Sequence, residues 1–238
     1  LFYNPAMVGA TNEILGSAIY RSQPLTESVM YNTTSALFMM PLMDAKKTRR
    51  WGGWGLSVLS DELKGSIDFR TQGLSAAYAY NLPVSSTQYV SLGLQAGVYQ
   101  RNIAMRGLST SSQWMDNIGY VPSMGNGEVV TDGRKNYFTL SSGMVYYKED
   151  EYHRQLTRLG VAAFNMNQPN VSLSDKYDDN IPIKIVAHAN QKIVEKGNVL
   201  VQGELLYYRE NSKNTYHGGA RFSYYFDATK PLAGSIDL

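Results

Sequence analysis

The most constraining stretch of the sequence is Gly73–Arg101, where two runs alternate between apolar residues and small or polar ones. Because successive side chains of a strand point to opposite sides, this period predicts two strands, each with one apolar face. The apolar faces comprise Leu74, Ala76, Tyr78 and Tyr80 in the first run and Val90, Leu92, Leu94, Ala96 and Val98 in the second. Pro83–Gln88, rich in Pro and Ser, predicts a tight turn between them. The apolar face of this hairpin must meet either a protein core or lipid.

The composition narrows the classes of protein to which the chain can belong. No apolar run approaches the roughly 18 residues of a membrane-spanning helix, which excludes such a helix but not a transmembrane barrel, whose strands are only half apolar. Cys is absent, so the chain has no disulfide, thiolate metal site or Cys nucleophile. A formal net charge of +2 gives no sign of a nucleic-acid partner. The 18 Tyr suit a boundary between oil and water.

Alternating runs recur along the chain and predict ten strands, with the start of an eleventh near the end. No segment of useful length has a helical period, and the short connectors permit direct hairpins, so we expect an all-β antiparallel meander. Besides the hairpin, the predicted strands are Ile14–Gln23, Tyr31–Pro41, Gly53–Ser60, Asn136–Lys148, Leu156–Met166, Ile183–Ile193, Val199–Arg209 and Thr215–Phe226.

Three features favour lipid over a protein core. The two longest connectors, Asn102–Lys135 and Asn167–Pro182, would leave the same end of the sheet, whereas most connectors at the other end are tight, as in outer-membrane barrels. Runs of about ten residues suit tilted membrane strands better than soluble sheets. Aromatic pairs such as Tyr146 with Tyr147 and Tyr207 with Tyr208 suit interfacial girdles. Periodicity alone leaves a soluble sandwich open. We therefore expect an antiparallel up-and-down transmembrane β-barrel.

Closure of this barrel is the difficulty. A membrane barrel cannot leave an open edge in lipid, because unpaired backbone groups there cost several kcal/mol each. Ten strands and the start of an eleventh therefore predict that residues 1–238 form a single, incomplete barrel domain. Further strands at its C-terminal end, or another chain that covers the edge, would close it. The chain begins at Leu1 without Met or a leader, so we also expect its N-terminus to have been removed.

Polar and large residues on the predicted inner face are the candidate partner-binding residues. Apolar residues in the long Asn102–Lys135 connector join them, because they could enter the lumen or form a docking surface. The full set comprises Gln95, Tyr99, Met105, Trp114, Met115, Lys184, His188, Gln202, Glu204, His217 and Arg221.

Other clusters give weaker signals. His188 and His217 could share a lumenal hydrolase site, but no nucleophile lies at a fitting spacing, so polar packing is preferred. Asp175, Asp178 and Asp179 offer oxygen ligands for Ca²⁺, yet a solvated acidic loop explains them better. The basic run Lys46, Lys47, Arg49 and Arg50 could dock an acidic partner or be a solvated turn. We expect no cofactor, no metal and no catalytic residue.

Several short motifs resemble the PorP/SprF family of outer-membrane proteins, associated with type IX secretion and gliding motility in Bacteroidota-type bacteria. Their order and spacing, from Asn4 to about Tyr225, carry the resemblance. A departure is Pro24, which follows Gln23 where family members often have Trp. The motifs are Asn4-Pro5-Ala6 with Gly9, Tyr20-Arg21 with Gln23, Gly55-Leu56-Ser57-Val58 with Asp61, Gly73-Leu74-Ser75 with Tyr78-Ala79-Tyr80, Leu92-Gly93-Leu94 with Ala96-Gly97, and Asn165–Pro169.

The resemblance implies a non-enzymatic outer-membrane barrel that binds, anchors or helps to export a large surface adhesin of the SprB type. The implied partners are the C-terminal domain or stalk of that adhesin, periplasmic ring components of the secretion and motility apparatus, and outer-membrane lipid. A diffusion porin and a soluble all-β binding module are the alternatives. Conductance in a planar bilayer would indicate the porin, and monodispersity without detergent the soluble module.

Overall fold

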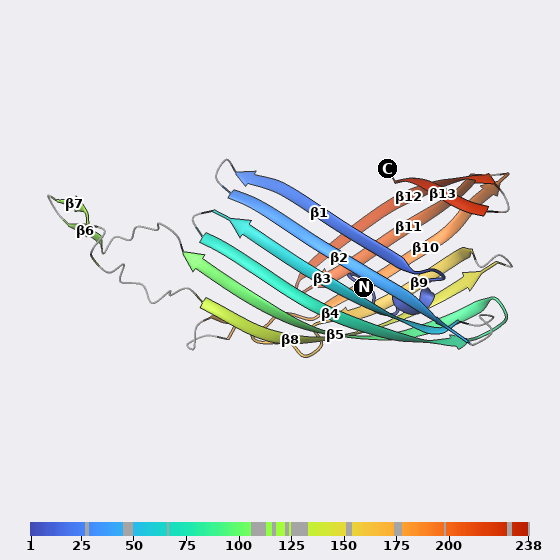
Figure 1. Cartoon of the computed structure of the whole chain (residues 1–238), viewed down its shortest axis with the longest axis horizontal. Coiled ribbons are helices and arrows are strands. Elements are labelled where there is room, and N and C mark those ends of the chain that lie inside the picture. Colours follow the sequence, from blue (N-terminus) through green and yellow to red (C-terminus); the bar gives the residue numbers. More distant parts are fainter. Residues whose placement is uncertain are drawn as a thin grey trace.

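A computed structural model describes most of the chain. It covers residues 1–26, 29–44, 50–65, 67–105, 113–115, 118–121, 124, 133–150, 154–173, 178–197, 199–227 and 230–237, with side chains left undescribed at 67, 105 and 223–237. Eleven strands form one antiparallel sheet that curls into a half-barrel, as Figure 1 shows. The predicted all-β class is therefore confirmed, including its incomplete closure.

The strands follow one another in the sheet in chain order, so every connection in the sheet is a hairpin. A separate small sheet pairs β6 (Trp114–Met115) with β7 (Gly119–Tyr120) inside the longest connector. The large sheet comprises β1 (Leu15–Thr26), β2 (Val29–Met43), β3 (Arg50–Lys64), β4 (Ile67–Pro83), β5 (Gln88–Met105), β8 (Gly133–Glu149), β9 (Gln155–Phe164), β10 (Lys184–Lys196), β11 (Val199–Glu210), β12 (Lys213–Asp227) and β13 (Lys230–Asp237).

The hairpin of β4 and β5 has the predicted faces. Its turn is closed by hydrogen bonds from the Val84 and Ser85 amides to the Gln88 carbonyl, at 2.8 and 3.2 Å. On the convex side Leu94 is 68% exposed, whereas on the concave side Ser91 is fully buried.

Most of the predicted strands lie within observed strands, which extend one to several residues beyond the predicted ends. We call the end with the two longest connectors, 106–132 and 165–183, the long-loop end, and the opposite end the short-turn end.

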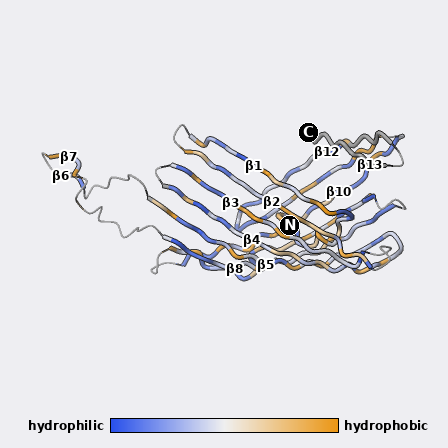
Figure 2. Tube along the Cα trace, viewed as in Figure 1, coloured by the Kyte–Doolittle hydropathy of each residue, from blue (hydrophilic) through white to orange (hydrophobic). Residues whose placement is uncertain are grey.

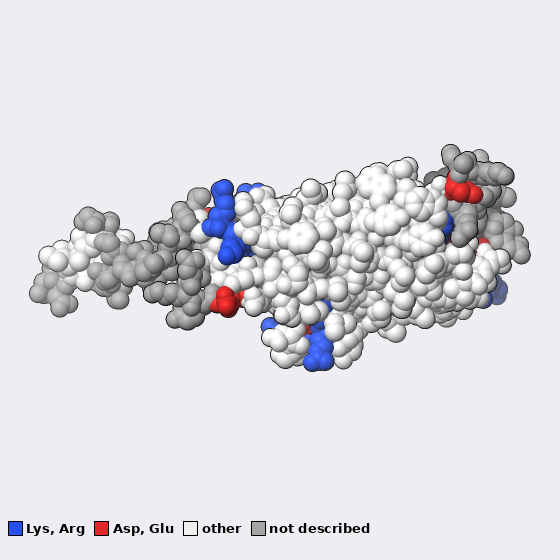
Figure 3. Space-filling view, turned by 90° about the horizontal axis from the view of Figure 1, so that it is seen from below, with Lys and Arg blue, Asp and Glu red and all other residues white. Residues whose placement is uncertain are grey.

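The half-barrel is apolar outside and polar inside, the reverse of a soluble protein. Large apolar side chains point outward on neighbouring strands, and Ser, Asn and Gln side chains are buried within. Charged residues gather toward the ends of the face seen in Figure 3 and leave a broad uncharged belt between them. On β5 this belt runs from Val90 to Val98, about 26 Å of strand, or about 20 Å in height at a tilt of about 40°. An apolar surface of this extent requires an apolar environment.

Hydropathy alternates along the strands, and in Figure 2 the ends of β3–β5 toward the long loops are more hydrophilic than their middles. The apolar belt therefore stops short of that end, and the wall continues beyond it. Among the described residues, no helix is long and apolar enough to cross a membrane.

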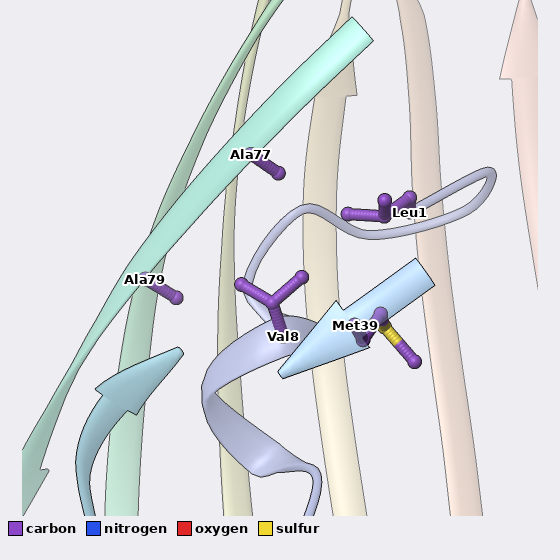
Figure 4. Close-up of a cluster of buried hydrophobic side chains, with 5 residues drawn as sticks. All are labelled: Leu1, Val8, Met39, Ala77 and Ala79. Carbon is purple, nitrogen blue, oxygen red and sulfur yellow. The ribbon is translucent and has the colours of Figure 1, made fainter. Parts of the chain in front are cut away.

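The N-terminal segment Leu1–Ala10, which we call the plug, lies inside the concave face and ends in the short helix α1 (Met7–Ala10). Its apolar side chains pack against Ala77 and Ala79 of β4, which point toward it in Figure 4. The plug has space because glycines, which have no side chain, stand opposite it. A Cβ at Gly93 would lie 2.4 Å from the Ala6 nitrogen, and one at Gly53 would lie 1.9 Å from the Val8 oxygen. These glycines allow the plug to approach the wall closely.

The aromatic pairs are not continuous girdles. Adjacent residues of a strand face opposite sides, so only one member of each pair can meet lipid. Tyr147 is fully buried on the concave side and stacks on Tyr89, with ring centroids 5.2 Å apart. Tyr208 also faces inward, against His217. The interpretation of these pairs as girdles was therefore wrong for Tyr147 and Tyr208.

Changing Gly93 to Val should weaken the fold by about 1–3 kcal/mol, because the added side chain must displace the plug backbone. Gly219→Val is the matched control, since a Cβ at Gly219 meets nothing within 4 Å. Urea unfolding in detergent, followed by tryptophan fluorescence, measures both. Equal stabilities of the two variants would contradict close packing of the plug.

Candidate functional site

Hydrogen bonds hold the plug to five strands, β4, β5, β8, β9 and β10. The fully buried Asn4 is central: its amide donates to the carbonyls of Met144 and Val161, both at 3.2 Å, and its Oδ1 accepts from the Ala6 amide at 2.9 Å. The same amide nitrogen lies 3.0 Å from Nε2 of His188 on β10. One side chain thus links the plug to β8, β9 and β10. The Ser91 hydroxyl on β5 donates to the Ala6 carbonyl at 2.9 Å.

The C-terminal end of the plug is bound to the short-turn half of the wall. The Asn81 amide donates to the Gly9 carbonyl at 2.7 Å, and the Gln155 amide donates to the Ala10 carbonyl. Gly9 also accepts a longer bond of 3.5 Å from the Tyr147 hydroxyl. Asn81 and Tyr147 are themselves buried, so these bonds form away from water and favour one position of the segment.

A buried ion pair lies beside that end of the plug. Arg50 of β3 donates to Glu149 of β8 at 2.8 Å and to the Tyr147 hydroxyl at 2.7 Å, and its guanidinium lies 5.1 Å from the Tyr147 ring centre. The side chains of the pair are only 7% and 3% exposed. Because β4 and β5 lie between these strands, the pair spans the concave face. The basic-run prediction was therefore wrong for Arg50, and the rest of that run lies outside the described residues.

Above the plug, toward the long-loop end, the concave face encloses a cavity of about 410 Å³ that we call the vestibule. Its wall includes side chains from β2–β5, β8, β10 and β11, so it extends across the lumen. The lining combines aromatic rings with both signs of charge: Tyr31, Phe69, Tyr99 and Tyr137 with Asp61, Arg101, Lys184 and Glu210.

The vestibule has stacked rings and polar atoms that lack partners. The rings of Tyr99 and Tyr137 stack with centroids 5.5 Å apart, and Arg101 lies 5.1 Å from the Phe69 ring centre while pairing with Asp179 at 3.3 Å. Among the described residues, Oδ1 of Asp61 and Nε of Arg101 are buried without a hydrogen-bond partner. A ligand that both donates and accepts hydrogen bonds would satisfy the two groups.

Strands β10–β12 form a second wall, which carries large polar side chains. The Asn190 amide donates to Glu204 at 2.7 Å, and Arg221 pairs with Glu204 at 3.2 Å. His217 stacks on Tyr208 with centroids 5.8 Å apart, and Lys184 lies 4.7 Å from the centre of that ring. Helix α1 of the plug packs on β2–β5 and β8, whereas Asn4 and Tyr3 contact this second wall at His188.

Most of the predicted partner-binding residues meet inside the half-barrel. Gln95, which donates to Ser75 at 2.9 Å, and Tyr99 lie on the plug-side wall, while Lys184, His188, Gln202, Glu204, His217 and Arg221 share the β10–β12 wall. Trp114 and Met115 lie instead on β6, drawn in Figure 1 beyond the long-loop end of the sheet, and are 61% and 44% exposed. The Met105 side chain is outside the described part. A role in partner binding stays a prediction for all of them.

Sequence reasoning missed Asn4, Asp61 and Tyr137 as site residues. Asn4 and Asp61 appeared only within family-like motifs, and Tyr137 only within a predicted strand. The alternation places Asp61 and Tyr137 on inward positions, so the pattern could have identified them. The alternating pattern could not identify Asn4, because residues 1–10 do not alternate as strands do.

The acidic loop shows no metal site in its described part. Asp178 accepts a bond of 2.6 Å from the Asn170 amide, and Asp179 pairs with Arg101. No group of His, Asp and Glu suited to a metal occurs in the part of the chain that the structure describes. Asp175 and His153 lie outside it.

The sequence of residues 1–234 matches the family described as "Type IX secretion system membrane protein PorP/SprF". The chain belongs to the PorP/SprF family. Comparisons with curated proteins and with solved structures gave no significant match. The PorP/SprF motifs now have structural roles: Asn4 and Ala6 form the hydrogen-bonded part of the plug, and Gly93 is the wall position against which it packs. Membership makes this chain a membrane component of type IX secretion.

Glu149→Gln should destabilise the barrel by about 3–5 kcal/mol, because it leaves the Arg50 guanidinium buried without its counter-charge. Lys64→Gln is the control, since Lys64 belongs to a largely exposed pair whose loss costs at most about 1 kcal/mol. The midpoints of urea unfolding in detergent measure the stability of both variants. Similar midpoints for the two variants would mean that the Arg50–Glu149 pair does not stabilise the fold.

Proposed function

We propose that this PorP/SprF barrel lies in the outer membrane and binds an exported surface protein in its vestibule, anchoring that protein or guiding its export. The observation that carries the proposal is the division of the concave face. The plug packs in the short-turn half, whereas the long-loop half holds a cavity with stacked rings and unpartnered polar atoms of Asp61 and Arg101. Such a cavity suits binding of a polypeptide segment, which offers N–H and C=O groups and side chains for aromatic rings.

The lengths of the loops support an orientation of the barrel in the outer membrane. In outer-membrane barrels the long loops face outward and the short turns face the periplasm. The vestibule would then open to the cell surface, where a large adhesin is the expected partner, through its C-terminal domain or stalk. The short-turn end would face the periplasmic ring components of the secretion apparatus. The absence of enzymatic activity stays a prediction.

Asp61→Arg should reduce recovery of the surface partner at least tenfold, because it places a bulky charge inside the vestibule. Glu62→Arg is the matched control: it is the next residue of β3, points outward, and pairs with exposed Lys64 at 3.3 Å. The measurement is a mild-detergent pull-down from the native envelope, quantified by mass spectrometry. Recovery of neither a large surface protein nor secretion components with the wild-type barrel would refute the proposal.

The porin alternative makes a different prediction. Because the plug occupies the half of the concave face toward the short turns, we expect the purified barrel to give little single-channel conductance in a planar bilayer. Deletion of residues 1–10 should raise the conductance if the barrel still folds, as judged by heat-modifiable migration. A large, steady conductance of the wild-type barrel would favour the porin.

A further inference from the structure

Besides the vestibule, the lumen holds a cavity of about 530 Å³ between the plug and the β9–β12 wall, which we call the side cavity. Its apolar lining comprises Met7 and Ala10 of the plug, Leu15 of β1 and Met39 of β2, with Leu200 on β11. Its polar lining carries arginines from three places: Arg154 before β9, Arg158 within β9 and Arg221 on β12. Thr11, Asn12 and the exposed Glu13 complete the lining near the plug.

The three arginines differ in how they are paired. Arg154 contacts Asp150 and Glu195, both at 2.7 Å, and Arg221 contacts Glu204 at 3.2 Å. Among the described residues, the hydrogen-bond acceptor for Arg158 is the neutral Gln155 side chain, at 3.3 Å. Within the described residues no carboxylate lies within 4 Å of Arg158, and its Nε is buried without a hydrogen-bond partner.

Three neighbouring amide groups each donate a hydrogen bond within the protein. The Gln155 amide donates to the Ala10 carbonyl, the Asn190 amide to Glu204, and the Gln202 amide to the Gln155 carbonyl at 3.3 Å. Arg158 is half-buried, with its Nε buried and lacking an acceptor, so it is the arginine of this cavity that gains most from a negatively charged acceptor. Guanidinium groups bind carboxylates with two parallel hydrogen bonds.

We propose that the side cavity is a carboxylate-binding site in which Arg158 holds an acidic group of the exported partner, and an adjoining apolar side chain packs on Met7, Leu15 and Met39. This inference rests on the proposed function for the identity of the partner. Lining by Arg154 and Glu13 places the cavity toward the short-turn end, which faces the periplasm in the proposed orientation. The carboxylate would come from the C-terminus of a polypeptide or from an Asp or Glu side chain.

Fluorescence anisotropy with the purified wild-type barrel in detergent tests the site. The probes are fluorescein-labelled Gly-Ser-Gly-Ser-Leu with a free C-terminal carboxylate, its C-terminal amide, and Gly-Ser-Gly-Glu-Leu amide. We expect the free acid or the Glu-containing amide to bind at least tenfold more tightly than the uncharged amide. Preference for the free acid identifies a chain terminus as the source of the carboxylate, and preference for the Glu peptide identifies a side chain.

Arg158→Gln should abolish this preference, and Arg158→Lys should retain part of it, because the lysine keeps the charge without the bidentate geometry. Arg209→Gln, at an exposed outward position of β11, should leave it unchanged. Heat-modifiable migration confirms that each variant is folded. Equal binding of all three peptides, or a preference that survives in folded Arg158→Gln, would overturn the proposal.

The vestibule variant separates this inference from the proposed function. The Asp61→Arg barrel should lose the surface partner in the pull-down. It should still bind the carboxylate-bearing peptides more tightly than the uncharged amide, because Asp61 does not line the side cavity. Peptide preference without any recovered surface partner would reject the proposed function and leave the carboxylate site standing. A recovered partner without peptide preference would reject only the carboxylate site.

Discussion

Burial of the plug against small side chains is the constraint on which the rest of the structure depends. A sheet that is apolar outside cannot build its core in the usual way, so its inner face must be filled by other means. Here the filling is the chain's own N-terminal segment, held by Asn4 and accommodated by Gly53 and Gly93. Both polar groups of the Asn4 side chain are engaged, and this satisfies the requirement that buried amides find partners.

This packing divides the inner surface into two kinds of wall. Strands β3–β5 and β8 carry Ala, Ser and Gly where the plug lies, whereas strands β10–β12 carry large polar side chains, of which His188 contacts the plug. The vestibule and the side cavity are the spaces that remain above and beside the plug. In the function proposed above, the plug would form the floor of the vestibule and the cavities would offer the contacts to a partner.

The sequence predicted the strands well because their period depends only on which side each residue faces. The alternation places small residues such as Ser91 and Gly93 on one face, but it does not show that Leu1–Ala10 packs against them, because these contacts join residues far apart in the chain. Arg50 shows the same limit: in the sequence it belongs to a basic run, and only the fold brings it to Glu149. Side chains of one strand face are predictable, whereas pairings across the lumen are not.

Cross-linking of the plug to the wall tests the central claim most directly. The chain has no Cys, so in a Gly9→Cys, Ser91→Cys double variant no native thiol can form a competing disulfide. A Cβ at position 9 lies 2.3 Å from the Ser91 hydroxyl oxygen, close enough for a disulfide after a small shift. If the plug lies as described, the pair should oxidise rapidly and almost completely in intact cells, whereas Gly9→Cys with Ser17→Cys on β1 should not. Two free thiols at positions 9 and 91, both reactive toward a maleimide, would contradict the account.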